Sequence, residues 1–193
     1  LIHLVGDHLF QARGRVEVSQ ETLESFGDSL EFQQDTGWLT LFDNARILSQ
    51  DTVSGDTLDV RGDTITMNLP DDRIDEIEAR GRAQLLADDV DMRGPVIRLI
   101  FEDEELEHVF AVRRAVEKVL TPMIGGDDEY TSSADGMQPQ ALAEDFLLTG
   151  DSVEADLSGG ELERVYAAGN ARGVSTARDS LNTDTTDELI WSD

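Results

Sequence analysis

Residues 62–83 read GDTITMNLPDDRIDEIEARGRA, a pattern with two distinct halves. Ile65, Met67 and Leu69 alternate with polar residues, which is the period of a strand that buries one face. A Pro-Asp-Asp sequence then supplies turn chemistry. After the turn, small residues occupy every second position at Ala79, Gly81 and Ala83. We therefore predict a hairpin of two antiparallel strands.

The same pattern of small and aliphatic residues recurs along the chain at fixed distances from a glycine. It is found after Gly94, where only Arg113 departs from it, and after Gly150, and a looser copy follows Gly27. Such self-similarity indicates a repeat architecture in which neighbouring units cover each other's apolar rows. We expect one repeat-built β domain over residues 1–193. Its units are placed at about 14–50, 55–87, 90–120 and 145–177, with a flexible loop insert at 121–143.

Two segments are ambiguous, because RIDEIEARGRAQLLADD and EELEHVFAVRRAVEKVL are also amphipathic at helical spacing. We favour strands with a one-residue bulge, since Gly81 and Gly169 would each cost a helix interior about 1 kcal/mol. The small residues of each unit have two interpretations. They form either a ledge that a ligand or another backbone approaches closely, or a corner at which the sheet bends.

The chain is strongly acidic, with 42 acidic and 15 basic residues and a net charge of −27. This charge argues against a protein that binds nucleic acid or an anionic membrane surface. A highly solvated surface, as in a salt-adapted organism, and a face for a basic partner both remain open. There is no cysteine, which excludes thiol catalysis, disulfides and Cys-ligated metals. No apolar run is long enough to predict a transmembrane helix.

We predict no catalytic site, no cofactor and no metal. His3 and His8 flank Asp7, but no third ligand lies at a spacing typical of a metal site. His108, beside Glu107, is expected to be a solvated residue. The acidic runs at 88–91 and 125–130 lack the spacing of a calcium loop. No nucleophile elbow and no phosphate-cradling glycine loop is present.

Two stretches resemble a known family: LFDNARILSQDTVSGDTLDVRGDTITMNLPDDRIDEIEARGRAQL and LTGDSVEADLSGGELERVYAAGNARGV. They are similar to the OstA-like β-jellyroll of the lipopolysaccharide-transport periplasmic proteins A and C, also found in the N-terminal region of the outer-membrane protein D of that system. ARGRVEVSQETLESFGDSLEFQQ is a fainter match. The resemblance implies an all-β, elongated, twisted antiparallel jellyroll of stacked hairpins with an open V-shaped groove.

The resemblance also implies a function. Such a protein is a non-enzymatic periplasmic module that shelters the acyl chains of lipopolysaccharide or a related lipid, in some cases associated with the outer membrane. It joins other OstA-like jellyroll proteins head to tail by edge-strand pairing. The chain begins with Leu1, so we expect a mature or excised piece with truncated units at both ends. The side chains expected to line the groove are Ile65, Met67, Leu69, Ile74, Ile77, Ile97, Leu99, Phe101, Leu106, Val109, Val153, Leu157, Leu162 and Val165.

Two other functions compete with lipid transport. A structural β-solenoid, as a filament or surface stalk, would also stack short units, but it favours a near-constant coil length. The unit starts at Gly27, Gly62, Gly94 and Gly150 are unevenly spaced, which favours the open jellyroll. A β-helix carbohydrate-active enzyme would need catalytic Asp, Arg or Lys residues clustered on one parallel sheet face. The sequence shows no such cluster.

Overall fold

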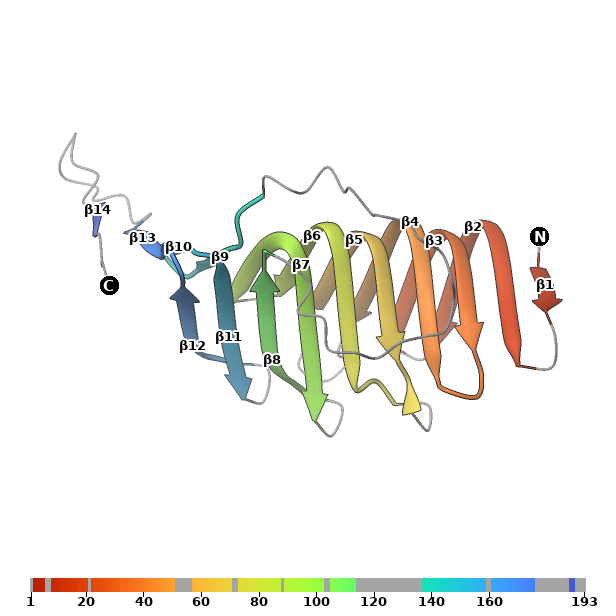
Figure 1. Ribbon diagram of the computed structural model, residues 1–193. Coiled ribbons are helices and arrows are strands. Elements are labelled where there is room, and N and C mark those ends of the chain that lie inside the picture. The colour runs from red at the N-terminus through yellow and green to blue at the C-terminus, as the bar shows by residue number, and fades with distance from the viewer. Residues whose placement is uncertain are drawn as a thin grey trace.

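The computed structural model describes residues 2–5, 8–20, 22–50, 57–70, 73–87, 89–102, 105–113, 137–158, 161–175 and 188–189. These residues form one sheet of fourteen strands (Figure 1). The first eight strands are β1 (Ile2–Val5), β2 (Leu9–Gln20), β3 (Leu23–Gln33), β4 (Trp38–Gln50), β5 (Thr57–Asn68), β6 (Glu76–Ala87), β7 (Val90–Glu102) and β8 (Glu105–Val112). The others are β9 (Gln140–Ala143), β10 (Phe146–Thr149), β11 (Ser152–Ser158), β12 (Glu161–Ala168), β13 (Arg172–Ser175) and β14 (Glu188–Leu189).

The sheet divides at β7. Up to that point each strand pairs with the next one in the chain. Residues 90–93 of β7 then pair with β9, whereas residues 96–102 pair with β8. From β9 the sheet continues through β10, β13 and β14, and from β8 it continues through β11 to β12. The two halves of β7 therefore pair with different strands, and the sheet continues from β7 in two separate branches.

The division is possible because the long strands bend near their middle. The register shifts at one point in each of the pairings from β2–β3 to β6–β7. At this point β2, β4 and β6 each carry two consecutive residues with positive φ, and the same conformation occurs between β12 and β13. These residue pairs are Gly14 and Arg15, Asp43 and Asn44, Gly81 and Arg82, and Gly169 and Asn170. Bulges of this kind turn a strand sharply and so form a corner.

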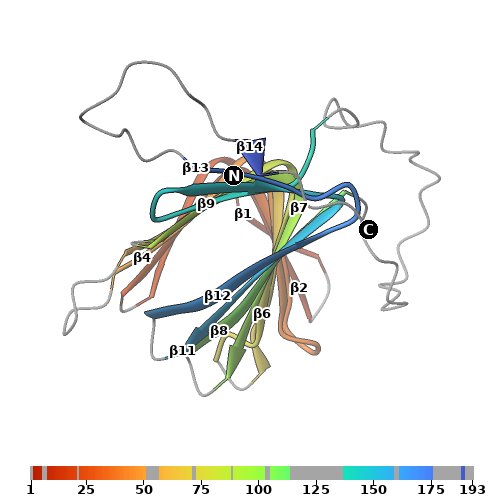
Figure 2. The same ribbon diagram turned by 90° about the vertical axis from the view of Figure 1, so that its left-hand side faces the viewer.

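The corners fold the sheet into two leaves, which diverge as the arms of a V in Figure 2. We call the arm that ends at β12 the β12 leaf; it contains β8, β11 and β12 and residues such as 64–68 and 76–80 of the long strands. The other arm, the β14 leaf, contains β9, β10, β13, β14 and residues such as 57–61 and 84–87. A single long strand thus contributes one half to each leaf.

The core lies between the leaves. On the β12 leaf the inward row runs across adjacent strands through Leu41, Ile65, Ala79 and Ile97, all of which are fully buried. On the β14 leaf the corresponding row includes Ile47, Val60, Leu85 and Met92. Both rows belong to one hydrophobic cluster. The alternation read from the sequence therefore places apolar side chains inside and polar ones outside.

The predicted all-β antiparallel architecture is confirmed, and the described parts of the two ambiguous segments form the strands β6 and β8. Every pairing in the described part of the chain is antiparallel, which excludes parallel β-solenoid and β-helix folds. The small residues of β6 form a corner, as one of the two interpretations held. The expected one-residue bulge is present in β6, because the register of both its pairings shifts by one residue at Gly81 and Arg82, which adopt positive φ.

The boundary expected for the loop at 121–143 is wrong at its C-terminal end. Residues 140–143 form β9, which pairs with both β7 and β10. Residues 121–136 lie outside the described part of the chain. The division into four units stays a prediction. Within the ranges that the structure describes, no helical segment has the length and apolarity needed to span a membrane.

Candidate functional site

All fourteen side chains predicted to line a groove belong to the single cluster between the leaves. Those that are buried are Ile65, Met67, Ile77, Ile97, Leu99, Val109, Val153 and Leu157. Those that are partly buried and packed against them are Leu69, Ile74, Phe101, Leu106, Leu162 and Val165. Their interior position follows from the period of two along each strand. Contact of these residues with lipid stays a prediction.

The prediction covered mainly one side of the interior. All fourteen predicted residues were identified in units that begin at Gly62, Gly94 or Gly150. They lie on or beside the β12 leaf. The inward row of the β14 leaf, which includes Ile47, Val60, Leu85 and Met92, was missed. These residues precede or follow the corner by a few positions and also alternate with polar residues. The signal was therefore present, but it is visible only if each strand is read through the corner.

The interior opens at the C-terminal end of the molecule. A hollow of about 330 Å³ lies there, a volume at the lower end of the range of about 300–1,000 Å³ found for ligand pockets. Apolar side chains supply most of its wall: β10 provides Phe146 and Leu148, and β12 provides Val165 and Ala167. Among the described residues, the lining consists of Phe146, Leu148, Val165, Tyr166, Ala167, Ala171, Arg172, Gly173 and Ser175.

The hollow continues the interior cluster. Val165 and Ala167 pack against the cluster from β12, and β12 pairs with β11 next to the buried Val153 and Ala155. Leu148 pairs with Ala141, which is also buried. The interior rows thus extend without a break from the packed centre to a wall that solvent reaches.

Large apolar side chains are unusually exposed at this end. Phe146 is 49% and Tyr166 is 58% exposed, and both line the hollow. Leu142 on the neighbouring β9 is 38% exposed, but it alternates with the buried Ala141 and Ala143 and so lies on the outer face. Exposed apolar groups that gather beside a hollow mark a binding surface more often than scattered ones do. Arg172 is the only charged side chain among the lining residues that the structure describes. The hollow therefore offers broad apolar contact with one guanidinium in its wall.

Charged groups of the long strands lie on the outer faces. Asp59 on the β14 leaf accepts hydrogen bonds from Arg46 and Arg61, with a shortest distance of 2.6 Å from Arg61 Nη2 to Asp59 Oδ2. Burial of Asp59 opposes ionisation, but the bonds from Arg61 and Arg46 outweigh it and lower the pKa of this carboxyl to about 2. On the β12 leaf, Arg98 Nη2 donates to Glu78 Oε2 at 2.7 Å. Such pairs satisfy the outer charges, so the interior keeps an apolar character.

The two histidines with described side chains each contact an aspartate. His8 Nδ1 lies 2.7 Å from Asp35 Oδ1, and both side chains are well exposed. His108 Nδ1 lies 2.9 Å from Asp156 Oδ1 on the neighbouring strand β11. His108 lies on the outer face with 42% of its side chain exposed, as expected, but its position on β8 also brings it to a carboxylate that is distant in sequence. His3 lies outside the residues whose side chains the structure describes.

Comparison with known proteins gives a fold-level match. No protein-family model matches the chain, and no curated protein matches it significantly. Among solved structures, the chain is similar to LptH, the LptA homologous periplasmic component of the conserved lipopolysaccharide transport device from Pseudomonas aeruginosa. The TM-score is 0.51 at 17% sequence identity, and the match covers 63% of this chain and 84% of LptH. The chain has the LptA-like, OstA-like fold that its sequence pattern resembles, as a divergent example of it.

Proposed function

We propose that this protein is a non-enzymatic lipid-transport or lipid-chaperone module that holds acyl chains between its two leaves. The observation that carries this proposal is the continuity between the interior cluster and the apolar hollow at the C-terminal end. Burial of one methylene group contributes about 0.8 kcal/mol. A few methylenes covered by Phe146, Leu148 and Val165 therefore suffice for reversible binding.

Lipopolysaccharide or a related lipid is the proposed cargo. An apolar interior with the charged groups placed outside excludes water and makes dispersion contacts with acyl chains. It does not bind a polar group tightly. Arg172 in the wall of the hollow favours a lipid whose polar end carries an anionic group. The fold shared with LptH supports the same class of cargo and a location in the periplasm.

The centre of the interior sets a limit on how lipid enters. Ile77, Leu99 and Val109 have no exposed surface, so the interior is closely packed there. Lipid can therefore occupy the hollow without rearrangement, whereas it reaches the centre only if the leaves move apart. In this proposal the hollow is the entry or exit position, and deeper contacts form during passage.

Head-to-tail assembly is the second part of the proposal. Among the described strands, β12 pairs only with β11, so its other edge offers unpaired backbone groups beside the hollow. An edge strand of another OstA-like jellyroll protein could extend the β12 leaf at this edge by β-augmentation. The apolar interiors of the two proteins would then form one continuous path.

Site-specific photo-crosslinking tests the proposed cargo. A photoreactive residue is placed at Leu148 or Val165 in the hollow, at Ile77 or Leu99 in the centre, and at Thr66 as a control. Thr66 alternates with the inward Ile65 and Met67 on the same strand, so it lies on the outer face. We expect lipopolysaccharide adducts from the hollow, fewer from the centre and none from Thr66. Equal adducts at Thr66, or none at any inward position, would contradict the proposal.

A further inference from the structure

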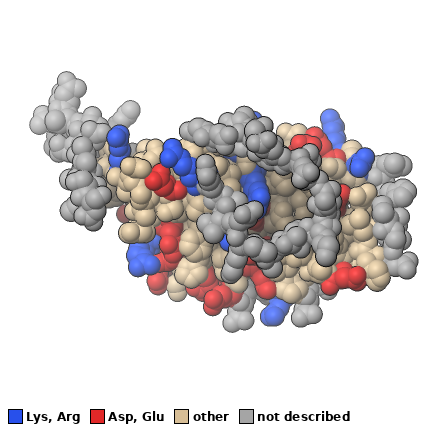
Figure 3. All heavy atoms as spheres, viewed as in Figure 1, with Lys and Arg blue, Asp and Glu red and all other residues tan. Residues whose placement is uncertain are grey.

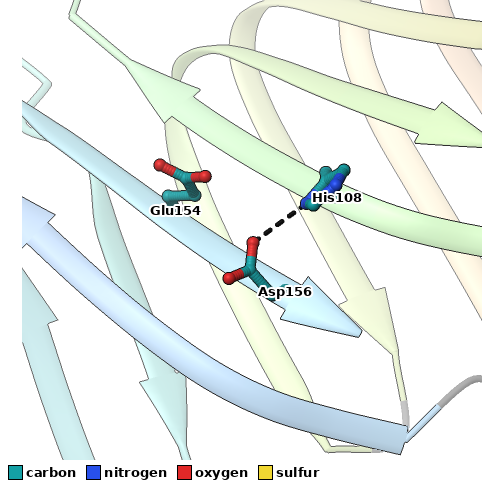
Figure 4. Close-up of side chains that lie close together, drawn as sticks. All are labelled: His108, Glu154 and Asp156. Atoms are coloured by element: carbon teal, nitrogen blue, oxygen red, sulfur yellow. Dashed lines mark hydrogen bonds and ion pairs between the residues drawn. The ribbon is translucent and has the colours of Figure 1, made fainter. Parts of the chain in front are cut away.

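A histidine and two carboxylates converge on the outer face of the β12 leaf, on the side away from the interior. His108 lies on β8, and Glu154 and Asp156 lie two residues apart on β11, so both carboxylates project from the same face (Figure 4). The register places His108 directly opposite Asp156 and Phe110 opposite Glu154. One ligand atom from each of the three residues lies within 4.8 Å of the others.

We propose that His108, Glu154 and Asp156 form a binding site for one divalent transition-metal ion, with Zn²⁺ as the best fit. Zinc is bound by imidazole nitrogen and carboxylate oxygen, and three protein ligands leave a fourth position for water or another group. Calcium and magnesium prefer sites made entirely of oxygen ligands. The imidazole of His108 therefore favours a transition-metal ion over calcium or magnesium.

The distances between the ligand atoms suit such an ion. Bonds of about 2.0–2.2 Å in tetrahedral geometry place neighbouring ligand atoms roughly 3.3 Å apart. His108 Nδ1 and Asp156 Oδ1 are 2.9 Å apart, so they need to separate by only a few tenths of an ångström. When the ion binds Nδ1, the ring proton moves to Nε2. Solvent can reach this imidazole, because the side chain of His108 is 42% exposed.

Asp156 is held in place by a second partner. Arg164 on β12 donates to Asp156 Oδ2, while His108 contacts Oδ1. The ion can therefore bind Oδ1 while Arg164 keeps Oδ2 and fixes the orientation of the carboxylate. Hydrogen bonds of this kind to ligating carboxylates are a regular feature of metal sites. The surrounding charge adds to the attraction, since acidic side chains also lie along the lower part of the face seen in Figure 3 and the net charge is −27.

The site has a consequence for the fold, because β8 and β11 are neighbours in the sheet but not in the sequence. An ion bound to His108 and Asp156 would link these two strands where the β12 leaf leaves the order of consecutive hairpins. Binding to the folded state alone raises thermal stability. The proposed ion therefore cross-links β8 and β11 and stabilises the β12 leaf, which borders the hollow.

Calorimetric titration of the metal-free protein with Zn²⁺ tests the site. We expect one ion per chain and a loss of affinity of about tenfold or more in both His108→Gln and Glu154→Gln. The matched control is the double variant His3→Gln with His8→Gln, which leaves His108 as the only imidazole and removes the exposed pair of His8 and Asp35. This control is expected to bind as the unaltered protein does. Circular dichroism verifies that each variant is folded.

A second measurement separates a site from ion condensation on an acidic surface. Co²⁺ bound with imidazole in tetrahedral geometry has an intense visible spectrum, which we expect in the protein and in the double control but not in His108→Gln. Excess Ca²⁺ should leave this spectrum unchanged. Zinc affinity that is equal in the protein and in His108→Gln, or displacement of Co²⁺ by an equal amount of Ca²⁺, would overturn the proposal.

Discussion

At the scale of single residues, the corners depend on backbone conformations that few side chains tolerate. Gly81 has φ +70°, and a Cβ atom added there would lie 2.9 Å from Asp63 Cβ. Asp63 lies at the corner of β5 and accepts a hydrogen bond from Arg82. The corners of β4 and of the β12–β13 junction repeat this arrangement, since Asn44 donates to Asp28 and Asn170 donates to Asp151. A side chain from the positive-φ pair thus donates to an aspartate that lies on an earlier strand or, for Asp151, directly before one.

Substitution of Gly81 tests this corner. We expect Gly81→Ala to lower the free energy of unfolding by about 2–3 kcal/mol, because the added methyl group meets both an unfavourable φ and the side chain of Asp63. Gly14→Ala is the control, since Gly14 has φ +86° but no atom within 4 Å of an added Cβ. It should cost only about 1 kcal/mol. Urea denaturation measures both values, and equal losses would show that contact with Asp63 is unimportant.

The lowered pKa of Asp59 predicts that the stability of the protein depends on pH. Because the pKa of Asp59 is lowered from 3.8 to about 2 in the folded protein, its contribution is complete above about pH 4 and is lost as the pH falls towards 2. We expect Asp59→Asn to cost about 1–2 kcal/mol at neutral pH, a value reduced for solvent screening because Arg46 and Arg61 are 39% and 49% exposed. The difference between the two proteins should shrink at the lowest pH at which both stay folded. A difference that is independent of pH would contradict this role.

At the scale of strands, the two faces of one strand should respond differently to truncation. Leu99 on β7 is fully buried between the leaves, whereas its neighbour Ile100 points outward and is partly exposed. We expect Leu99→Ala to lower the free energy of unfolding by about 2–5 kcal/mol and Ile100→Ala by about 1 kcal/mol or less. Thermal or urea unfolding of the two variants checks the assignment of faces. A larger loss at Ile100 would reverse it.

The unpaired edge of β12 leads to a second prediction about a single strand. The bulge in the β11–β12 pairing leaves Glu163 without a directly opposite residue on β11. A proline is tolerated best at an edge or a bulge, where no ladder hydrogen bond is lost. We expect Glu163→Pro to weaken head-to-tail association while it leaves the melting temperature nearly unchanged. Sedimentation velocity measures the association, and an unchanged distribution of species would place the contact elsewhere.

The sequence predicted the strands better than it predicted their extent. Alternation at Ile65, Met67 and Leu69 was sufficient to identify one face, and the repeat correctly outweighed the helical spacing around Gly81. The β14 leaf was missed because each strand was expected to begin at its glycine, although the glycine only marks a bend within it. β9 gave no usable signal, since four residues are too few to establish a period and a gap in the repeat surrounds them. His108 and Asp156 could not be paired from sequence, because β8 and β11 are joined by a non-local connection.

At the scale of the whole molecule, the fold gives a sheet with two ends of different character. At the N-terminal end β1 pairs with β2 in a simple hairpin (Figure 1). At the C-terminal end the leaves separate, and the apolar interior reaches the surface between β10, β12 and β13. The acidic surface keeps the molecule solvated, while the apolar interior remains available for a ligand. The proposed transport function depends on this separation.

A fluorescence titration with lipopolysaccharide tests the lipid-binding interior most directly. The chain has no cysteine, so Ala167→Cys and Thr66→Cys each create a single attachment point for a polarity-sensitive fluorophore, one in the hollow and one on the outer face. We predict that lipid shifts the emission of the probe at position 167 towards that of an apolar environment and leaves the probe at position 66 unchanged. Equal shifts at both positions, or no shift at position 167 while the lipid co-sediments with the protein, would contradict the proposal that lipid is held between the leaves.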